Sequence, residues 1–253
     1  MTSLVIVFDL DQTMGYFTQV GILIDSIETI LNRKMKLNEI FELFNLFPQI
    51  FRKGMMKTFA YLKTKKQNNK KIKIIIYTNN MGPKIWVHNI KKYIESKINY
   101  KLFNKTVAAW KVGNIIYEKK RTSHNKRYND LLDCCNLKKK DKIIFFDDFI
   151  HNQMKNDKIT YIHNKPYKYD YKFENMINKI FSSKLNKSLK LNSKNALLEE
   201  IKKYRYNYVN NKKKFKENEF INHIKLFLKE NRKNNSKKKK RKSKAKTQKI
   251  KLI

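Results

Sequence analysis

The sequence contains few cysteines and histidines, and their scarcity excludes two kinds of protein. The only two cysteines, Cys134 and Cys135, are adjacent, so a disulfide between them cannot join distant parts of a fold. This pattern indicates a reducing compartment and excludes a disulfide-rich scaffold. The five histidines show no paired spacing with the cysteines, so the sequence predicts no zinc site.

Long apolar runs are also absent from the sequence. No run approaches the length of a membrane span, and Asp9 and Asp11 interrupt the apolar run near the N-terminus. We therefore expect neither a signal peptide nor a membrane anchor. The expectation that follows is an intracellular protein, in the cytoplasm or the nucleus, with no membrane partner.

Acidic residues are scarce, since 21 Asp and Glu stand against 59 Lys and Arg, a formal net charge of +38. Residues 184–253 carry 25 Lys and Arg against 5 Asp and Glu, a net charge of +20, and residues 1–183 carry the other +18. A field of this sign favours phosphate backbones, so the sequence predicts a nucleic-acid partner for residues 184–253. The run SKKKKRKSKAKTQK within them also resembles a nuclear-import signal. An A/T-rich coding sequence is the alternative explanation, because it enriches Lys, Asn and Ile whatever the function.

The chain does have the apolar residues to bury a core, with 41% hydrophobic and 13% aromatic residues. The apolar run at residues 4–8 is typical of a strand covered on both faces. Similar runs predict strands at residues 72–77, 106–109, 143–146 and 159–162. Apolar spacings of three and four predict helices at residues 22–32, 36–47, 49–64, 84–97, 125–136 and 172–183, with weaker helical spacing at 195–209 and 215–231. Strands that alternate with helices predict an α/β fold, with a mostly parallel central sheet between two layers of helices.

Composition divides the chain into three parts. Residues 1–183 are the predicted α/β unit, which includes a short hairpin at residues 110–117. The unit also includes a helical stretch at residues 22–64, and the sequence leaves open whether that stretch is a small cap over the site. Residues 184–230 are predicted to be a basic helical extension, and residues 231–253 have the composition of a disordered Lys-rich tail.

Polar side chains follow three of the predicted strands. Asp9 and Asp11 follow the first strand, Thr78, Asn79 and Asn80 the second, and Asp147 and Asp148 the fourth. If these strands are neighbours, their carboxyl ends meet at the edge where open α/β sheets bind ligands. Carboxylates brought together there repel unless a cation relieves them, and Mg²⁺ prefers oxygen ligands that it shares with substrate phosphate. The sequence therefore predicts one Mg²⁺ ion and one phosphoryl group at this edge.

With these motifs the chain resembles the haloacid dehalogenase superfamily of phosphotransferases, whose first motif is DxDxT. The resemblance covers residues 4–181, and within the superfamily the chain is similar to the phosphatases of the NLI-interacting-factor and RNA polymerase C-terminal-domain group. The matching stretches are YTNNMGPKIW, KRTSHNKRYNDLLDCC, FFDDFIHNQM and YIHNKPYKY, which look closest to phosphatase-like proteins of large DNA viruses. The resemblance implies a three-layer Rossmann-like fold, phosphatase activity, and a location in a virion or a host cell.

The resemblance also implies roles for residues after the first two strands. Asp9 is the predicted nucleophile, which forms an aspartyl-phosphate, and Asp11 is the predicted general acid and base. Asp9 and the backbone carbonyl of Asp11 are predicted to bind Mg²⁺. Thr13 is expected to orient the loop and, with Asn79, to contact the substrate, while Thr78 donates to the phosphoryl oxygens. The alternative for Thr78 is a helix-cap or turn hydroxyl.

Similar proteins use a cation ahead of the fourth strand to neutralise the phosphoryl oxygens. Lys126 is the predicted residue, because it opens the predicted helix at residues 125–136. Lys119, Lys120 and Arg121 remain candidates, and Arg121 is also predicted to contact the substrate. For each single lysine of so basic a chain, a solvated surface position is an equally good prediction.

The motif after the fourth strand is expected to complete the metal site. Asp148 is predicted to bind Mg²⁺ directly or through water, and Asp147 to orient the lysine, although the two roles are exchangeable. The longer acidic version of this motif has another acid four residues on, where this chain has Asn152. The chain also lacks the amide that polymerase-tail phosphatases tend to carry directly after the first aspartate of the motif.

Four further side chains near these motifs are predicted to be structural. The loop histidines His124 and His151 are expected to be hydrogen-bonded rather than catalytic. Trp86 and Trp110 are expected to pack in the core or the hairpin rather than to stack on bases.

The predicted function is thus that of a Mg²⁺-dependent phosphomonoesterase. By resemblance its substrate is a phosphoserine or phosphothreonine protein. A nucleic-acid 3′-phosphate is the alternative, because TNNMG is similar to the TNQ-G segment of polynucleotide 3′-phosphatases and the tail is basic. A third hypothesis, of another class, is a nucleic-acid-binding or packaging protein that uses this fold without turnover. The sequence leaves the oligomeric state open.

Overall fold

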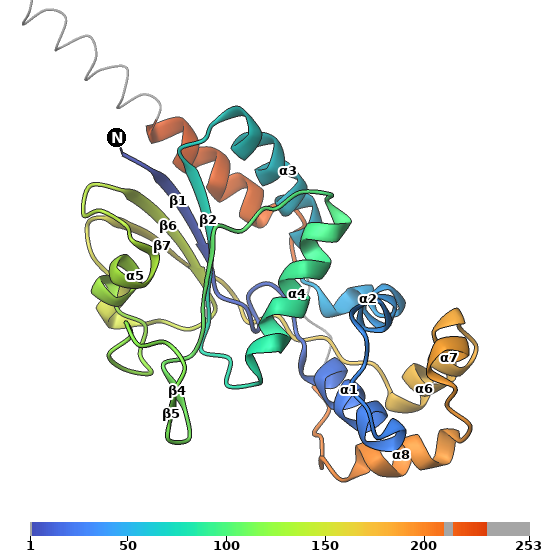
Figure 1. Cartoon of the computed structure of the whole chain (residues 1–253). Helices are drawn as coiled ribbons and strands as arrows, with labels where there is room; N and C mark the ends of the chain where they lie inside the picture. The colour runs from blue at the N-terminus through green and yellow to red at the C-terminus, as the bar shows by residue number, and fades with distance from the viewer. Residues whose placement is uncertain (1, 210–214, 232–253) are drawn as a thin grey trace, which may run out of the picture.

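The chain folds around a parallel β-sheet, as the computed structural model shows for residues 2–209 and 215–231 (Figure 1). The sheet has five strands in the order β3–β2–β1–β6–β7. Their bounds are Lys105–Val107, Ile72–Tyr77, Leu4–Phe8, Lys142–Asp147 and Ile159–His163. All pairings between these strands are parallel. The predicted α/β fold with a central parallel sheet is therefore confirmed.

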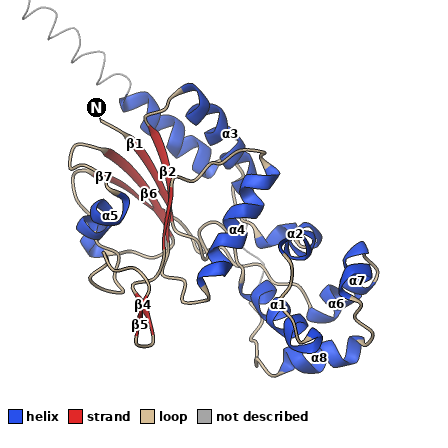
Figure 2. Ribbon diagram, in the orientation of Figure 1, coloured by secondary structure: helices blue, strands red, loops and turns tan. Residues whose placement is uncertain are grey.

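The two faces of the sheet bury separate apolar clusters. Successive residues of a strand point to opposite faces, so Val7 of β1 joins one cluster and Phe8 joins the other. The cluster with Val7 packs against α5 (Tyr128–Cys135). The cluster with Phe8 packs against α3 (Met55–Asn68), α4 (Lys84–Lys97) and a helix of residues 219–231 (Figure 2). These helices make the sheet the middle layer of three, as the sequence predicted.

The order of the strands places a switch point at the carboxyl end of β1. From β1 the chain moves outward through β2 to β3, and then returns to the other side of β1 to form β6 and β7. β1 and β6 pair in register from Leu4 with Lys142 to Phe8 with Phe146. The Asp9 backbone N–H continues the ladder and donates to the Phe146 carbonyl at 2.9 Å. Ligands of open α/β sheets bind at such a switch point, and Asp9 is the residue that follows β1 there.

Five helices form a second group beyond the carboxyl ends of the strands (Figure 1). They are α1 (Thr18–Leu31), α2 (Leu37–Leu46), α6 (Phe173–Phe181), α7 (Lys184–Leu189) and α8 (Lys194–Lys202). Within this helical unit α1 packs on α2 and α8, α2 on α6 and α7, and α6 on α7 and α8. Each helix buries an apolar stripe, as α6 does with Phe173, Met176, Ile177 and Ile180.

The helical stretch predicted at residues 22–64 is divided between the helical unit and the sheet. After α2, the short 3₁₀ helix η1 (Pro48–Ile50) and the turn at Gly54, with φ +80°, redirect the chain so that α3 contacts β2. Glycine suits this turn because a Cβ at residue 54 would lie 1.8 Å from the Glu217 carbonyl oxygen. Only the part of the predicted stretch that precedes Pro48 therefore belongs to the helical unit.

The helix of residues 219–231 covers the centre of the sheet, although the sequence placed the end of the α/β unit at residue 183. The Phe220 ring lies 4.8 Å from the Phe146 ring and 6.2 Å from the Phe8 ring, measured between centroids. Phe220 and Ile224, one turn apart, are both buried in the cluster that contains Phe8. The basic extension thus supplies a helix of the α/β layer in addition to α7 and α8.

Several boundaries differ from those predicted. Helix α5 begins at Tyr128, so Lys126 lies on the extended segment before the helix rather than at its start. Residues 203–209, within the weak helical spacing at 195–209, form no regular element. The predicted hairpin is present as β4 (Lys111–Val112) and β5 (Ile115–Ile116), and a second 3₁₀ helix, η2, spans Asn152–Met154. The predicted tail lies outside the described residues, apart from Asn231.

None of the helices in the described part of the chain combines the length and apolar character needed to cross a membrane.

Candidate active site

A buried lysine lies between two carboxylates at the carboxyl ends of the central strands. Asp9 follows β1, and Asp147 ends β6 at the matching register. The Lys126 Nζ atom lies 2.6 Å from Asp9 Oδ1 and 2.8 Å from Asp147 Oδ2. All three side chains are buried, so these charge-assisted hydrogen bonds are screened little by water. Of the predicted cations, the structure thus brings Lys126 to the carboxylates.

The carboxylates in this cluster outnumber the cation. Asp148 is the third, and one oxygen from each of Asp9, Asp147 and Asp148 lies within 4.8 Å of the others. Burial raises the pKa of Asp9, the Lys126 ammonium opposes this rise, and the Asp147 carboxylate adds to it. Burial alone would lower the pKa of Lys126, but Asp9 and Asp147 outweigh it and raise this pKa, so the lysine is charged. The effects on Asp9 together raise its pKa to about 8, so ionising this buried carboxylate beside Asp147 is costly, and a divalent cation bound there would offset that cost.

Polar groups around Asp148 test whether the site fits a hydrated cation. The Thr13 hydroxyl donates to Asp148 Oδ1 at 3.2 Å and accepts from Asn164 Nδ2 at 3.4 Å. The Asn164 Oδ1 atom is buried and has no hydrogen-bond partner among the described residues. A buried oxygen without a donor is costly unless water or an ion satisfies it. The residues present therefore fit Mg²⁺, with Asp9, Asp147 and Asp148 as the carboxylates that would hold it.

Asp11 lies apart from the three-carboxylate group and faces the loop after β2. Its Oδ2 atom accepts from Asn80 Nδ2 at 2.8 Å. Burial raises the pKa of Asp11, and the hydrogen bond from Asn80 opposes this rise. A raised pKa favours the protonated form that a general acid requires. The raised pKa of Asp11 and its position outside the acidic cluster are compatible with the predicted role of general acid and base. That role and the predicted contact of its backbone carbonyl with Mg²⁺ stay predictions.

The loop after β2 is held by its own side chains. The Asn80 backbone N–H donates to the Thr78 hydroxyl at 2.9 Å, and Gly82 N–H donates to Asn80 Oδ1 at 3.0 Å. Thr78 thus has the turn role that was the alternative for it. This bond uses the oxygen of the Thr78 hydroxyl and not its hydrogen, so the predicted donation to a phosphoryl oxygen stays a prediction.

Arg121 is buried under this loop and holds it in place. Its two terminal nitrogens donate to the carbonyls of Thr78, Ala108 and His124 at 2.7–3.1 Å. One of them also donates to the Asn79 side-chain oxygen at 2.6 Å. Four N–H groups are used in these bonds, so they favour a structural role for Arg121 and Asn79 over the predicted contact with the substrate.

The other residues singled out in the sequence lie around this centre. His151 is buried, and its Nδ1 accepts from the Lys126 backbone N–H at 3.4 Å. Burial and, next, the Lys126 ammonium lower the pKa of His151 to about 4, so the ring is neutral near pH 7. Asn152, where the longer motif has an acid, is exposed in η2. The Trp86 ring packs against Phe17 and Phe44 of the core, as predicted.

Arg52 anchors the loop of Asp9 and Asp11 from behind, and no feature of the sequence distinguishes it. Its guanidinium is buried and donates to the Lys165 carbonyl at 2.8 Å and to the Gln12 carbonyl at 3.4 Å. The Tyr167 backbone N–H donates to the same Gln12 carbonyl at 2.7 Å. Gln12 has a positive φ of 58°, which is uncommon for a residue other than glycine. The contacts from Arg52 and Tyr167 stabilise this strained residue between Asp11 and Thr13.

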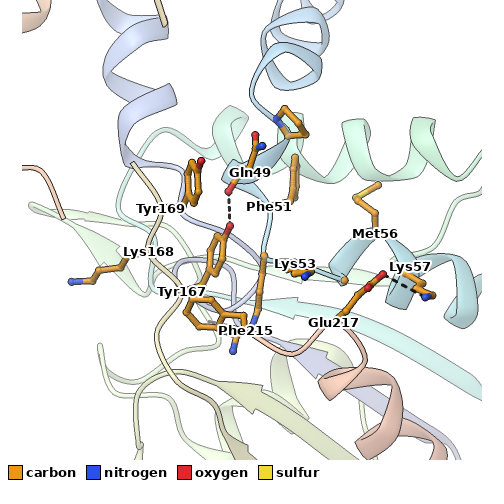
Figure 3. Close-up of a pocket in the computed structure, with 13 residues that line it drawn as sticks. Gln49, Phe51, Lys53, Met56, Lys57, Tyr167, Lys168, Tyr169, Phe215 and Glu217 are labelled. Carbon is orange, nitrogen blue, oxygen red and sulfur yellow. Dashed lines mark hydrogen bonds and ion pairs between the residues drawn. The ribbon is translucent and has the colours of Figure 1, made fainter. Parts of the chain in front are cut away.

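Arg52 also lines a wide pocket of about 820 Å³, which we call the Tyr167 groove (Figure 3). Figure 3 shows its aromatic side chains and lysines around Tyr167, whose hydroxyl donates to the Gln49 carbonyl at 2.7 Å. The residues that give the groove its character are Phe51, Tyr167, Tyr169, Phe215, Lys53, Lys57 and Lys168. Glu217 is its only acidic residue in the described part of the chain, and it pairs with Lys57 at 3.4 Å.

The amides of the site are harder to recognise in the sequence than its carboxylates. The sequence indicates Asn80 only as one of three polar residues after a strand. It does not indicate a role for Asn164, which directly follows β7. The available signal was positional, because Asn164 follows a predicted strand as Asp9 and Asp147 do. No comparable signal marks Arg52, which is one cation among 59 in the sequence.

Comparison with known proteins adds no identification to this geometry. No protein-family model matches the chain, and no curated protein matches it in sequence.

Proposed function

We propose that the protein is a Mg²⁺-dependent phosphomonoesterase of the haloacid dehalogenase type, with Asp9 as the nucleophile. The observation that carries the proposal is the Lys126 ammonium between Asp9 and Asp147, with Asp148 beside them, at the switch point of a parallel sheet. The DLDQT motif and the stretches that resemble this superfamily support it. When bound, Mg²⁺ would offset the repulsion between an anionic nucleophile and an anionic phosphoryl group.

The proposed reaction proceeds in two displacements. Lys126 contacts Oδ1 of Asp9, which leaves Oδ2 to attack phosphorus while the bond to the leaving oxygen breaks. Asp11 gives its proton to that leaving oxygen. Asp11 then accepts a proton from a water molecule, whose oxygen attacks phosphorus and releases Asp9 and inorganic phosphate. The separation of Asp11 from the acidic cluster, with a pKa raised by burial, supports these two roles.

For the substrate, we propose a phosphoserine or phosphothreonine protein. The net charge of +38 and the lysines of the Tyr167 groove are the observations that favour a nucleic-acid 3′-phosphate instead. The two classes differ in the charge that surrounds the phosphate, because a polynucleotide carries one further negative charge per nucleotide. Parallel assays of a phosphopeptide and a 3′-phosphorylated oligonucleotide distinguish them.

The test of the activity is hydrolysis of a small aryl phosphate by the full chain, with and without Mg²⁺. We expect turnover only with the metal, and Asp9→Asn should lower kcat/KM by at least about a thousandfold, because the nucleophile is lost. Asp157→Asn is the matched control, since Asp157 is exposed in the turn before β7 and is not part of the acidic cluster. A loss of only a few-fold in Asp9→Asn would contradict the mechanism. Salt-dependent DNA binding without turnover would favour the non-catalytic alternative.

A further inference from the structure

A cleft of about 440 Å³ begins at Asp11 and Asn80 and runs beside α1, and we call it the Asp11 cleft. Its other wall is the start of α4, with Gly82, Pro83 and Trp86. Because Asp11 is the proposed acid for the leaving group, the cleft lies where the part of the substrate beyond the phosphate would be held. The inference below rests on that proposed function.

One face of α1 lines the cleft along its length. The lining residues Thr18, Gly21, Asp25 and Glu28 follow one another at spacings of three and four, which places them in one row on a helix. A helix rises 1.5 Å per residue, so Asp25 lies about 10 Å along the axis from Thr18. An extended peptide advances about 3.3 Å per residue, so this distance corresponds to about three residues of a bound segment.

The floor of the cleft between these positions is apolar. Phe17, Ile24 and Ile40 line it and are buried, while Ile85 at its rim is 60% exposed. The Trp86 ring completes the floor and lies 6.4 Å from the Phe17 ring, measured between centroids. An apolar side chain of a bound segment would bury its surface against this floor.

The charge of the cleft is opposite to that of the chain. Asp11, Asp25 and Glu28 line it, and Lys34 is its only cation in the described part of the chain. Lys34 forms an ion pair with Glu28, with 2.6 Å between Nζ and Oε2. Asp25 forms no ion pair with any side chain that the structure describes. Partial burial and the nearby Glu28 raise the pKa of Asp25. In a chain with nearly three basic residues for each acidic one, an acidic cleft is unexpected unless a cation is bound there.

We propose that the Asp11 cleft selects a phosphoprotein segment with an apolar side chain beside the phosphorylated residue and a basic side chain about three residues away, which pairs with Asp25 next to the carboxylate of Glu28. Apolar contact fixes the segment next to Asp11, and the basic side chain meets the unpaired carboxylate of Asp25. A polynucleotide is disfavoured here, because its phosphates would approach two carboxylates.

Two phosphoserine peptides test the charge preference. Both carry leucine on each side of the phosphoserine, and they differ in having arginine or glutamate three residues away on both sides. We expect kcat/KM for the arginine peptide to be about tenfold higher, since each exposed ion pair adds little but the glutamate peptide is also repelled. Equal values for the two peptides, or a higher value for a 3′-phosphorylated oligonucleotide, would overturn the inference.

Variants of the two carboxylates assign the preference to the cleft. Asp25→Asn combined with Glu28→Gln should reduce the tenfold ratio to about twofold or less, because the attraction and the repulsion both disappear. The control removes the same charge elsewhere, by Asp157→Asn with Glu199→Gln at two exposed positions, and should keep the ratio. If the control reduces the ratio equally, the preference arises from net charge and the cleft is not its source.

Gly21 offers a second variant that does not depend on charge. A Cβ added at Gly21 meets nothing within 4 Å, so the helix accepts a larger residue that extends into the cleft. Replacing glycine inside a helix also favours folding. Gly21→Leu should lower kcat/KM for the arginine peptide more than tenfold, and Gly21→Ala should lower it much less. Equal values for Gly21→Leu and the unmodified protein would contradict binding of the peptide in this cleft.

Binding to the Asp9→Asn variant separates this inference from the proposed activity. Fluorescence anisotropy of the labelled arginine and glutamate peptides reports the preference without turnover. A preference in binding with no hydrolysis by the unmodified chain would uphold the cleft and refute only the phosphatase proposal. Hydrolysis of the aryl phosphate with no preference between the peptides would do the reverse.

Discussion

Two cavities lie near the loop that follows β1, and they differ in size, in charge and in their contact with the carboxylate that we propose as the general acid. The Tyr167 groove, at about 820 Å³, is the larger and carries several lysines, whereas the Asp11 cleft, at about 440 Å³, is apolar and acidic. Two residues of the groove, Arg52 and Tyr167, donate to the Gln12 backbone carbonyl of the loop, whereas Asp11 of the loop lines the cleft directly. For the proposed activity, the smaller cavity is therefore the better candidate for the substrate site, because one of its lining residues is the proposed general acid.

The acidic residues of the Asp11 cleft are more informative than the lysines of the Tyr167 groove. Lys and Arg make up 59 of the 253 residues, so lysines around the Tyr167 groove are what composition alone would place there. Asp and Glu make up only 21, and three of them line the smaller cavity. The rarer side chain is the more informative one. Lysines around the Tyr167 groove therefore do not by themselves indicate an anionic ligand, although the chain is strongly basic.

The largest expected loss of activity comes from replacing Lys126, which lies between Asp9 and Asp147. Lys126→Met should lower kcat/KM for an aryl phosphate by about a thousandfold or more, because the ammonium that balances Asp9 and Asp147 is lost from a buried site. Steady-state kinetics with saturating Mg²⁺ measure this loss, and circular dichroism confirms that the variant is folded.

The matched control for Lys126 is Lys120→Met, because Lys120 is exposed and donates to the Asp133 carbonyl and the Asn136 side chain. This variant should retain activity within about twofold, as exposed substitutions usually have small effects. If the folded Lys126→Met protein is as active as the Lys120→Met protein, the cleft lies beside an inactive cluster, and the contrast between the two cavities loses its functional meaning.

Arg52 should give the next largest effect, because it joins the Tyr167 groove to the loop after β1 that holds Asp9 and Asp11. Arg52→Met removes the charged donor to the Lys165 carbonyl and should reduce the free energy of unfolding by about 2–3 kcal/mol. The loss of support for Gln12 should also lower kcat/KM about tenfold through misplacement of the loop. Thermal unfolding and aryl phosphate hydrolysis measure the two effects.

Arg52→Lys is the informative comparison for that prediction. Lysine keeps the charge but not the planar set of donors that reaches Lys165 and Gln12 together, so it should recover little of the stability. Full stability and activity in Arg52→Met would show that the groove has no connection to the loop after β1. That result would make the two cavities independent.

The sheet and the centre of the site follow from patterns that a sequence displays. A run such as LVIVF remains apolar because both faces of β1 are covered, and the carboxylates directly after β1 and β6 meet because parallel strands share an edge. The cation is different, since so many lysines precede β6 that only the resemblance singled out Lys126. Its geometry fits the expectation, while its role stays a prediction.

The features that the sequence does not reveal depend on which surface a helix or a side chain meets. The spacing at residues 215–231 predicts a helix but not that Phe220 packs on Phe146 of the sheet rather than within the helical unit. Similarly, Arg52 differs from the surface cations only by its burial, which results from the contact of the segment after η1 with helix 219–231. Partners far apart in the chain leave no periodic signal in either segment.

The smallest expected change in activity comes from removing two lysines of the Tyr167 groove. Lys53 and Lys168 are exposed at the rim of the Tyr167 groove, and replacing both by glutamine removes two charges without disturbing a buried contact. We expect kcat/KM for the arginine phosphopeptide to change by less than about twofold at physiological salt, because exposed charges are screened beyond about 8 Å. Removal of Asp25 and Glu28 alters charge by the same amount in the other cavity and should have the larger effect on that peptide. If the lysine variant instead loses more activity than the carboxylate variant, the substrate is held by the groove, and the smaller cavity is not the site of selection.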